Sequence, residues 1–366
     1  MENNKMKFAD LHLHAWTYSA LNLFPDLSKC TSFEEIEETL RAHPLNNWYV
    51  GVRFNQEFLK EKQIPSKALL DSWFPDHPAL LVRTCLHLAV LNTKAMEQLG
   101  FNAPSGVLLE EEVFNLLEKF IEVNAIPKQE VLEKGVRRLS EFGITKFVDM
   151  HVTKENASLL AGFPFYTSDP DLLSDALGLK VFLDGSLGAR TAALTKEYSD
   201  DPGNYGKLNH TDEELFSLVE LAHKKDKPVA LHAIGDRAID QALSVLKKSR
   251  HPLDRIEHLQ ITRLDQIEEL AKLEIAACIQ PIFSKELPWA TERVGNRIET
   301  SYAWGLMKDY GVKLLVGSDA PVDDVSPFEA AKVVDELQGP HHLDKDFVLK
   351  LYSSDNFDFY GWERQT

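Results

Sequence analysis

Two histidines separated by a single leucine, His12 and His14, stand near the start of this 366-residue chain. Residues two apart in a β-strand share a face, so both imidazoles would point the same way. Asp10 has the same parity and is a candidate carboxylate for orienting the two rings. Imidazoles gathered in this way suit a divalent metal ion. The His-X-His pattern is short, so its weight depends on residues elsewhere in the chain.

Further metal-type side chains close other apolar segments. His232 ends PVALHA, His258 falls in RIEHLQ and Asp319 ends LLVGSD. If these segments are parallel strands of a barrel, their carboxyl ends build one active site. Four histidines and an aspartate at one rim predict a site for Zn²⁺ or a similar ion.

Lys180 lies inside the apolar segment LKVFLDG. A lysine in a buried strand is costly unless its charge is removed or paired. Reaction with CO₂ would give a carbamate that bridges two metals as a carboxylate does. A salt bridge to Asp184 or a nearby glutamate is the alternative, and the residues alone leave both open.

Two cations bridged by one anion and a hydroxide suit hydrolysis. The metals lower the pKa of the shared water and polarise the scissile carbonyl. Asp319, as a ligand that also faces the water, would accept its proton and pass it to the leaving group.

The elements that position these residues alternate between strand and helix. Short apolar runs predict buried parallel strands, at 7–14, 145–151, 163–168, 179–185, 228–233, 255–260, 275–281 and 312–319. Helices are expected at 32–42, 128–142, 211–226, 236–249, 263–273, 298–310 and 327–337. This alternation predicts a (β/α)₈ barrel of TIM type. No GxGxxG follows the first strand, which weakens the alternative of an open doubly wound sheet.

Two of the expected helices begin with the signature of a capping box. Thr211 is followed by Glu214, and Ser32 by Glu35, at the spacing that lets side chain and backbone bond reciprocally. About 130 residues separate the first two strands, and connections this long usually carry their own structure. We expect residues 1–39 to begin the barrel, 40–125 to form an inserted subdomain over its mouth, and 126–366 to complete it.

Net charge, cysteine count and hydropathy limit the kinds of partner and the cellular compartment that we expect. The formal net charge is -17, which disfavours a nucleic-acid partner. Three cysteines without a CxxC fit a reduced, cytoplasmic protein. The N-terminus shows no apolar signal-peptide core, and no stretch approaches the ~20 apolar residues of a membrane span. We expect a cytoplasmic enzyme with a small-molecule substrate, no membrane partner, and homo-oligomers as an open option.

The motifs follow one another in a recognisable order: HLH, LKVFLDGSLGARTAAL (179–194), ALHAIGDRAID (230–240), RIEHLQ (255–260), CIQP (278–281) and VGSDAPV (316–322). In this order they resemble amidohydrolase family 3, metal-dependent hydrolases that include N-substituted formamide deformylases. The resemblance continues upstream in WYVGVRFNQEFL (48–59) and GITKFVDM (143–150), and spans about residues 8–355.

The resemblance implies a binuclear centre, with zinc as the expected metal. Its ligands would be His12, His14, His232, His258, Asp319 and a carbamylated Lys180 bridging the metals. Asp319 would also be the general base. The implied reaction is hydrolysis of a carbon–nitrogen, amide-type bond other than a peptide bond. Ester or lactone hydrolysis, a mononuclear deaminase and a non-catalytic metal-binding protein are the alternatives.

The resemblance also bears on substrate contacts and on domains. His87 and Asn92 match a segment expected to line the substrate pocket, and Arg190 and Arg297 are further candidates for substrate contact. Family members usually carry a β-sandwich built from segments before the first barrel strand and after the last helix. We expect this sandwich to be absent here.

Overall fold

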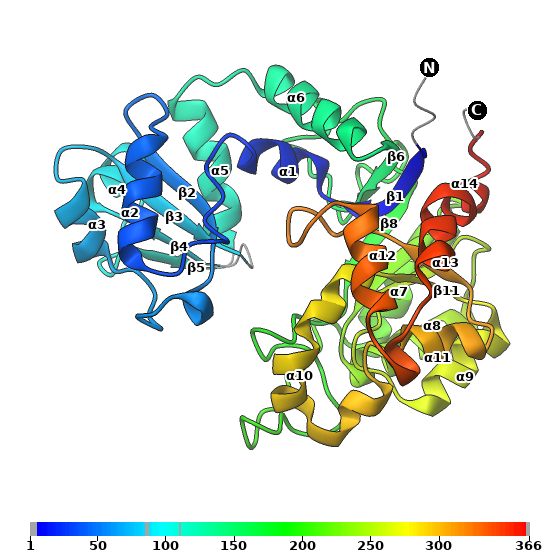
Figure 1. Ribbon diagram of the computed structural model, residues 1–366. Coiled ribbons are helices and arrows are strands. Elements are labelled where there is room, and N and C mark those ends of the chain that lie inside the picture. Colours follow the sequence, from blue (N-terminus) through cyan, green and yellow to red (C-terminus); the bar gives the residue numbers. More distant parts are fainter. Residues whose placement is uncertain (1–5, 85–87, 110, 364–366) are drawn as a thin grey trace, which may run out of the picture. The chain divides into compact units, whose positions relative to one another are not determined.

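The computed structural model describes residues 6–84, 88–109 and 111–363. The chain divides into two compact units, shown in Figure 1: Met1–His14 together with Arg138–Thr366, and Ala15–Arg137. The subdomain predicted at 40–125 falls inside the second unit, which also takes in residues 15–39 and 126–137.

The first unit is built on parallel strands that neighbour one another in chain order. β1 (Phe8–Leu13) pairs with β6 (Ile144–Asp149), and a bridge between Asp149 and Phe165 leads on to β7 (Tyr166–Thr167). The sheet then continues through β8 (Gly178–Phe182), β9 (Val229–Ala233), β10 (Arg255–His258), β11 (Ala276–Ile279) and β12 (Leu314–Val316). Each strand predicted for the barrel coincides with one of these. The first unit is therefore an α/β fold with parallel strands.

Helices separate most of these strands. They are α6 (Lys128–Glu141), whose residues up to Arg137 belong to the second unit, α7 (Asp212–His223), α8 (Asp236–Lys248), α9 (Leu264–Leu273), α10 (Leu287–Val294) and α11 (Trp304–Asp309). Helices α12 (Pro327–Asp335), α13 (Lys345–Lys350) and α14 (Asn356–Phe359) follow the last strand. The Thr211–Glu214 capping box at α7 is confirmed. The single helix predicted at 298–310 is wrong. Tyr302 has a φ of +49° and donates its backbone N–H to Gln260 O, which breaks the segment before α11.

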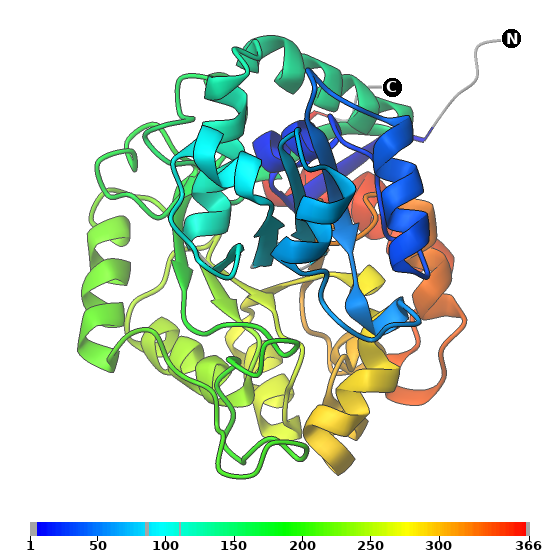
Figure 2. The same cartoon turned by 90° about the vertical axis from the view of Figure 1, so that its left-hand side faces the viewer.

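The second unit has a four-stranded sheet of its own, coloured blue to cyan in Figures 1 and 2. Its strands are β2 (Tyr49–Phe54), β3 (Ala79–Arg83), β4 (Leu88–Leu91) and β5 (Val107–Leu109), and only β2 and β3 are parallel neighbours. Its helices are α1 (Ala15–Leu21), α2 (Phe33–Ala42), α3 (Lys67–Trp73), α4 (Thr93–Leu99) and α5 (Glu111–Val123). A core that includes Leu40, Phe54, Leu70 and Leu81 holds helices α2 and α3 against the sheet.

The start of α2 differs from its expected form. Ser32 Oγ accepts from Glu35 N–H, as predicted, but the Glu35 carboxylate accepts from the N–H of Thr31 rather than of Ser32. The cap is therefore made, while the reciprocal bond falls one residue earlier. The described residues contain no helix that is long and apolar enough to cross a membrane.

The first and last strands of the first unit are joined mainly by side chains and loop ends. Asn356, which is fully buried in α14, donates to Ala9 O at 2.6 Å and Val316 O at 2.9 Å, and accepts from Val316 N–H at 3.2 Å. Beyond β12, Asp319 N–H donates to His12 O at 2.6 Å, and His14 N–H donates to Ala320 O at 2.8 Å. One amide thus satisfies backbone groups of both strands.

Replacement of Asn356 by alanine should weaken the connection between β1 and β12. It would leave three buried backbone groups without a partner, so we expect a loss of about 3 kcal/mol or more in the free energy of unfolding, measured by urea titration. Asn209→Ala is the matched control, because Asn209 is itself exposed and also donates to two backbone oxygens. Equal losses for both variants would contradict the role of Asn356.

Candidate metal centre

The end of β1 and the turn after β12 bring three metal-type side chains together. Asp319 Oδ1 lies 3.1 Å from His14 Nε2 and 3.4 Å from His12 Nε2. His12 is 1% exposed and Asp319 7%, so water screens these contacts poorly. A carboxylate oxygen and an imidazole lone pair this close repel each other unless a proton or a cation lies between them.

His258 and His232 join the cluster from β10 and β9. Ring centroids lie 4.9 Å apart for His12 and His258, and 4.4 Å apart for His232 and His258. His258 Nδ1 is 2.8 Å from Gln280 Oε1, an acceptor that fixes the proton on Nδ1 and leaves Nε2 free. His12, His258 and Asp319 together offer ligand atoms within 4.8 Å of one another.

Backbone geometry explains how His258 reaches the cluster. Strict strand alternation would put Glu257 and His258 on opposite faces. His258 has a φ of +72° and Leu259 a φ of +51°, so the strand turns at its end. Both Glu257 and His258 consequently lie beside His12. Left-handed backbone at non-glycine residues is uncommon and costs free energy, so the surrounding packing must hold His258 and Leu259 in it.

Lys180 points into this interior from β8. Its side chain is 1% exposed, its Nζ has no hydrogen-bond partner among the described residues, and it lies 5.0 Å from the centre of the Phe182 ring. The predicted alternative of a salt bridge to Asp184 is wrong. The Asp184 carboxylate instead accepts from the backbone N–H groups of Ala193, Ile234 and Gly235.

Burial sets the protonation of the cluster. It lowers the pKa of His12, His232 and His258 well below the ordinary histidine value, which favours neutral rings with a lone pair to offer. Burial alone would raise the pKa of Asp319, but His12 and His14 lower it below its usual value. Neutral imidazoles and an ionised carboxylate are the donor set of a zinc-type site, so these residues fit a divalent cation.

The carboxylate that orients His12 is Glu257 and not Asp10. Glu257 Oε2 lies 2.5 Å from His12 Nδ1, whereas Asp10 accepts from the backbone N–H groups of His12 and Ser318. Sequence reasoning missed Glu257, although an acidic residue inside the buried strand RIEH was a usable signal. Gln280, the orienting partner of His258, was also missed.

A second group of potential ligands lies behind His12. His12, Glu257 and Cys278 also have ligand atoms within 4.8 Å of one another. The second oxygen of Glu257 forms an ion pair with Arg255, which already supplies the positive charge a metal would bring. We therefore place the candidate metal on the side of His12 that faces Asp319.

Three of the four predicted substrate residues make hydrogen bonds within the fold, and the fourth lies outside the described residues. Asn92 is fully buried, accepts from Ala79 and Ala95 N–H, and donates to two backbone oxygens of its own unit. These bonds fix its side chain within the second unit, and its predicted contact with substrate stays a prediction. Its companion His87 lies outside the described residues.

The two candidate arginines are also engaged in the fold. Arg190 forms a two-pronged pair with Asp200, with Nη2 at 2.8 Å and Nε at 3.2 Å from the carboxylate oxygens. Arg297 donates to backbone oxygens of Val294, Lys196 and Glu197. These contacts hold loops together, and the substrate contacts predicted for both residues stay a prediction.

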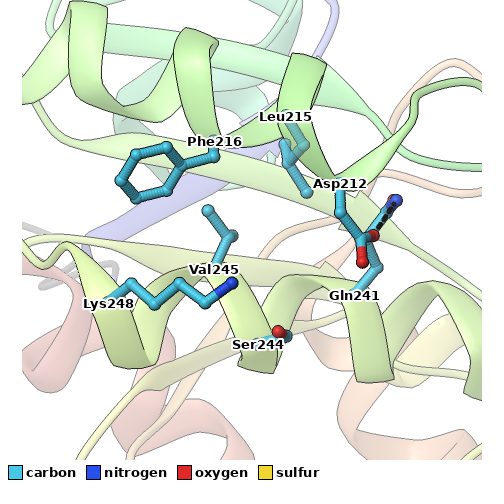
Figure 3. Close-up of a pocket in the computed structure, with 7 residues that line it drawn as sticks. All are labelled: Asp212, Leu215, Phe216, Gln241, Ser244, Val245 and Lys248. Carbon is cyan, nitrogen blue, oxygen red and sulfur yellow. Dashed lines mark hydrogen bonds between the residues drawn. The ribbon is translucent and has the colours of Figure 1, made fainter.

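A hollow elsewhere in the first unit is unrelated to this cluster. It lies between α7 and α8 and is lined by Asp212, Leu215, Phe216, Gln241, Ser244, Val245 and Lys248, as Figure 3 shows. None of the candidate metal ligands lines it.

Comparison with known proteins agrees with this chemistry. A family model described as "Amidohydrolase family" matches residues 8–341. Amidohydrolase YtcJ of Bacillus subtilis is 30% identical over 414 aligned positions, covering 94% of this chain and 78% of that protein. N-substituted formamide deformylase of Arthrobacter pascens is 24% identical, covering 88% of this chain and 71% of that protein.

A solved structure gives the same picture. An uncharacterised metal-dependent hydrolase from Pyrococcus furiosus superimposes with a TM-score of 0.78 at 25% sequence identity. The match covers 97% of this chain and 82% of that one.

Gly317 controls the approach of Asp319 to the histidines. A Cβ atom at this position would lie 2.4 Å from His12 Cβ and 2.5 Å from His12 N. Gly317→Ala should therefore cost about 1–3 kcal/mol of stability. By moving the turn it should also weaken Zn²⁺ binding, measured by competition with a chelator. Exposed Gly188, whose Cβ would meet only Trp289 at 3.8 Å, is the control. Unchanged Zn²⁺ affinity in Gly317→Ala would show that this approach is unimportant.

Proposed function

This chain belongs to the amidohydrolase family, and on that premise we propose that it hydrolyses a carbon–nitrogen, amide-type bond other than a peptide bond in a small molecule. The observation that carries the proposal is Lys180, a buried amine without a hydrogen-bond partner among the described residues, beside the cluster of histidines and Asp319. Structural residues of this kind are normally paired, so an unpaired one points to a functional modification.

We propose that the parallel strands of the first unit close into a (β/α)₈ barrel. The support is the continuity of the strand pairing from β1 through β6 to β12, together with the bonds between His12 and Asp319 and between His14 and Ala320. In such a barrel every candidate ligand belongs to the carboxyl-end rim, where catalytic residues of this fold gather.

We propose that the rim holds two divalent cations, with zinc as the first candidate, and a carboxylated Lys180. His12, His14, His232, His258 and Asp319 would be the other ligands. Burial lowers the pKa of Lys180, which favours the neutral amine. That amine forms a bond from Nζ to the carbon of CO₂ and loses one proton, giving an anion with two oxygens.

We assign the other steps of the proposed reaction to residues of this chain. Divalent cations held here would polarise the scissile carbonyl and lower the pKa of water. Asp319 Oδ1 faces both imidazoles, so we assign proton acceptance from the attacking water to Oδ2, which then protonates the leaving nitrogen. Gln280 and Glu257 keep the rings of His258 and His12 in place. A carboxylated Lys180 favours this chemistry over a mononuclear deaminase, which has no use for it.

The name of one relative supports the substrate class that we propose. The relative from Arthrobacter pascens is named for removing the formyl group from N-substituted formamides. We propose small acylated amines as substrates of this protein, and esters or lactones as the alternative, because the same site would activate either carbonyl.

Metal content and intact mass test the proposed centre. We expect near two divalent ions per chain by elemental analysis and an added mass of one CO₂ by native mass spectrometry. The added mass should disappear in Lys180→Ala, together with most of the metal. One metal per chain and an unmodified Lys180 would instead favour the deaminase.

Asp319→Asn tests the proton acceptor. The amide keeps the shape of the side chain but cannot take the proton, so kcat for an N-acyl amine should fall by about 10²–10⁴-fold. Metal content, measured in parallel, separates loss of the base from loss of a ligand. Near-normal turnover with full metal content would remove Asp319 from this role.

A further inference from the structure

Arg255 lies where a charged group is least expected, within the interior of the first unit. It is the first residue of β10 and is fully buried. Its Nη2 donates to Leu11 O at 2.8 Å and contacts Met150 Sδ at 2.9 Å. A guanidinium stays protonated in proteins, so this position carries a permanent positive charge.

Two kinds of group compensate that charge. Glu257 Oε1 lies 2.6 Å from Arg255 Nε, and both side chains are fully buried. The rings of Tyr166 and Tyr360 have their centres 5.0 Å and 5.9 Å from the guanidinium carbon, within the range of a cation–π contact. The two tyrosine hydroxyls meet at 3.0 Å, which ties the C-terminal segment to β7.

Glu257 connects Arg255 to the candidate metal centre. Its other oxygen, Oε2, lies 2.5 Å from His12 Nδ1. An ionised carboxylate can only accept a hydrogen bond, so the shared proton belongs to Nδ1. A neutral imidazole has one N–H, which leaves the lone pair on Nε2, the atom that faces Asp319 at 3.4 Å.

We propose that Arg255 is a positioning residue for the metal centre, which acts through Glu257 to hold His12 in the tautomer that offers Nε2 to the metal. Tyr166 and Tyr360 enclose Arg255 and keep it against Glu257. The inference rests on the proposed function only in requiring that the His12 cluster binds a metal.

A merely structural ion pair makes a different prediction. Removing one charge of a buried pair leaves the other uncompensated and is strongly destabilising, whereas removing both is often tolerated. If Arg255 and Glu257 served stability alone, losing both would restore every property of the protein. If they position His12, the double variant would recover its stability while His12 still lacked its acceptor.

The experiment is a double-mutant cycle with Glu257→Leu, which has no acceptor for His12 Nδ1–H, Arg255→Met and the two combined. Each protein is prepared without metal, and Zn²⁺ affinity is measured by chelator competition beside thermal unfolding. We expect both single variants to unfold at lower temperature and to bind Zn²⁺ about 10–100-fold more weakly. The double variant should recover most of the melting temperature but none of the Zn²⁺ affinity. Recovery of both together would overturn the proposal.

A matched control comes from a second buried carboxylate that contacts a histidine. Asp254 is 4% exposed and its Oδ1 lies 3.1 Å from His223 Nε2, and neither residue belongs to the metal cluster. Asp254→Asn should lower stability and leave Zn²⁺ affinity unchanged. A comparable loss of affinity in this control would show that the assay follows stability and not the position of His12.

A spectroscopic measurement covers the case in which the single variants fail to fold. Nitrogen-15 NMR of the metal-free protein reports which ring nitrogen of His12 carries the proton, with His12→Asn identifying the signals. We expect a protonated Nδ1 and a bare Nε2, and a bare Nδ1 would overturn the proposal. Neither measurement uses a substrate, so a failure to find hydrolysis would leave this result intact.

Discussion

The beginning and the end of the first unit have to meet before a site can exist. The hydrogen bond from Asp319 N–H to His12 O, at 2.6 Å, fixes two candidate ligands relative to each other through their own backbones. Gly317 allows this approach because a side chain there would collide with His12. Asn356 then satisfies the backbone groups that the two strands leave open further down. The positions of His12 and Asp319 relative to each other therefore depend on these contacts between β1 and the end of β12.

The interior of the first unit, next to these contacts, holds several ionisable groups. Asp10, Lys180, Asp184, Arg255 and Glu257 are all at most 2% exposed. Each carries a cost of desolvation that an apolar residue of similar size would avoid. Four of them are held by backbone N–H groups or by one another. Lys180 is the exception among the described residues, because its Nζ has no hydrogen-bond partner there and burial lowers its pKa toward the neutral amine.

Much of this architecture can be predicted from the sequence, and the reason is local. Strands are short apolar runs, and a histidine or aspartate that ends such a run is conspicuous by type and position. His12, His232 and Asp319 are therefore identifiable from residue type and position alone. Glu257 and Asn356 are not, because their partners lie 245 and up to 347 residues away and depend on which strands become neighbours.

The bonds that Asn92 and Arg297 make in the fold could not be predicted from the sequence for a related reason. A conspicuous arginine or asparagine in a loop is as often used by the loop itself as by a ligand. Asn92 caps α4 and accepts a hydrogen bond from the first residue of β3. Arg297 donates hydrogen bonds to three backbone oxygens. Sequence spacing cannot reveal this, since the acceptors are carbonyls that every residue carries.

The pairing of β1 with β6, and its bonds to Asn356 and to the turn after β12, also bear on how the chain folds during synthesis. β1 leaves the ribosome first, yet Phe8 pairs with Ile144, and Ala9 is bonded to a side chain 347 residues further on. The second unit, by contrast, is one uninterrupted stretch, Ala15–Arg137, whose contacts are available much earlier. Long-range pairings form late and leave strand edges open in the meantime. β1, which carries His12 and ends just before His14, is therefore made before β6 and the segments at the end of β12 that hold it in place.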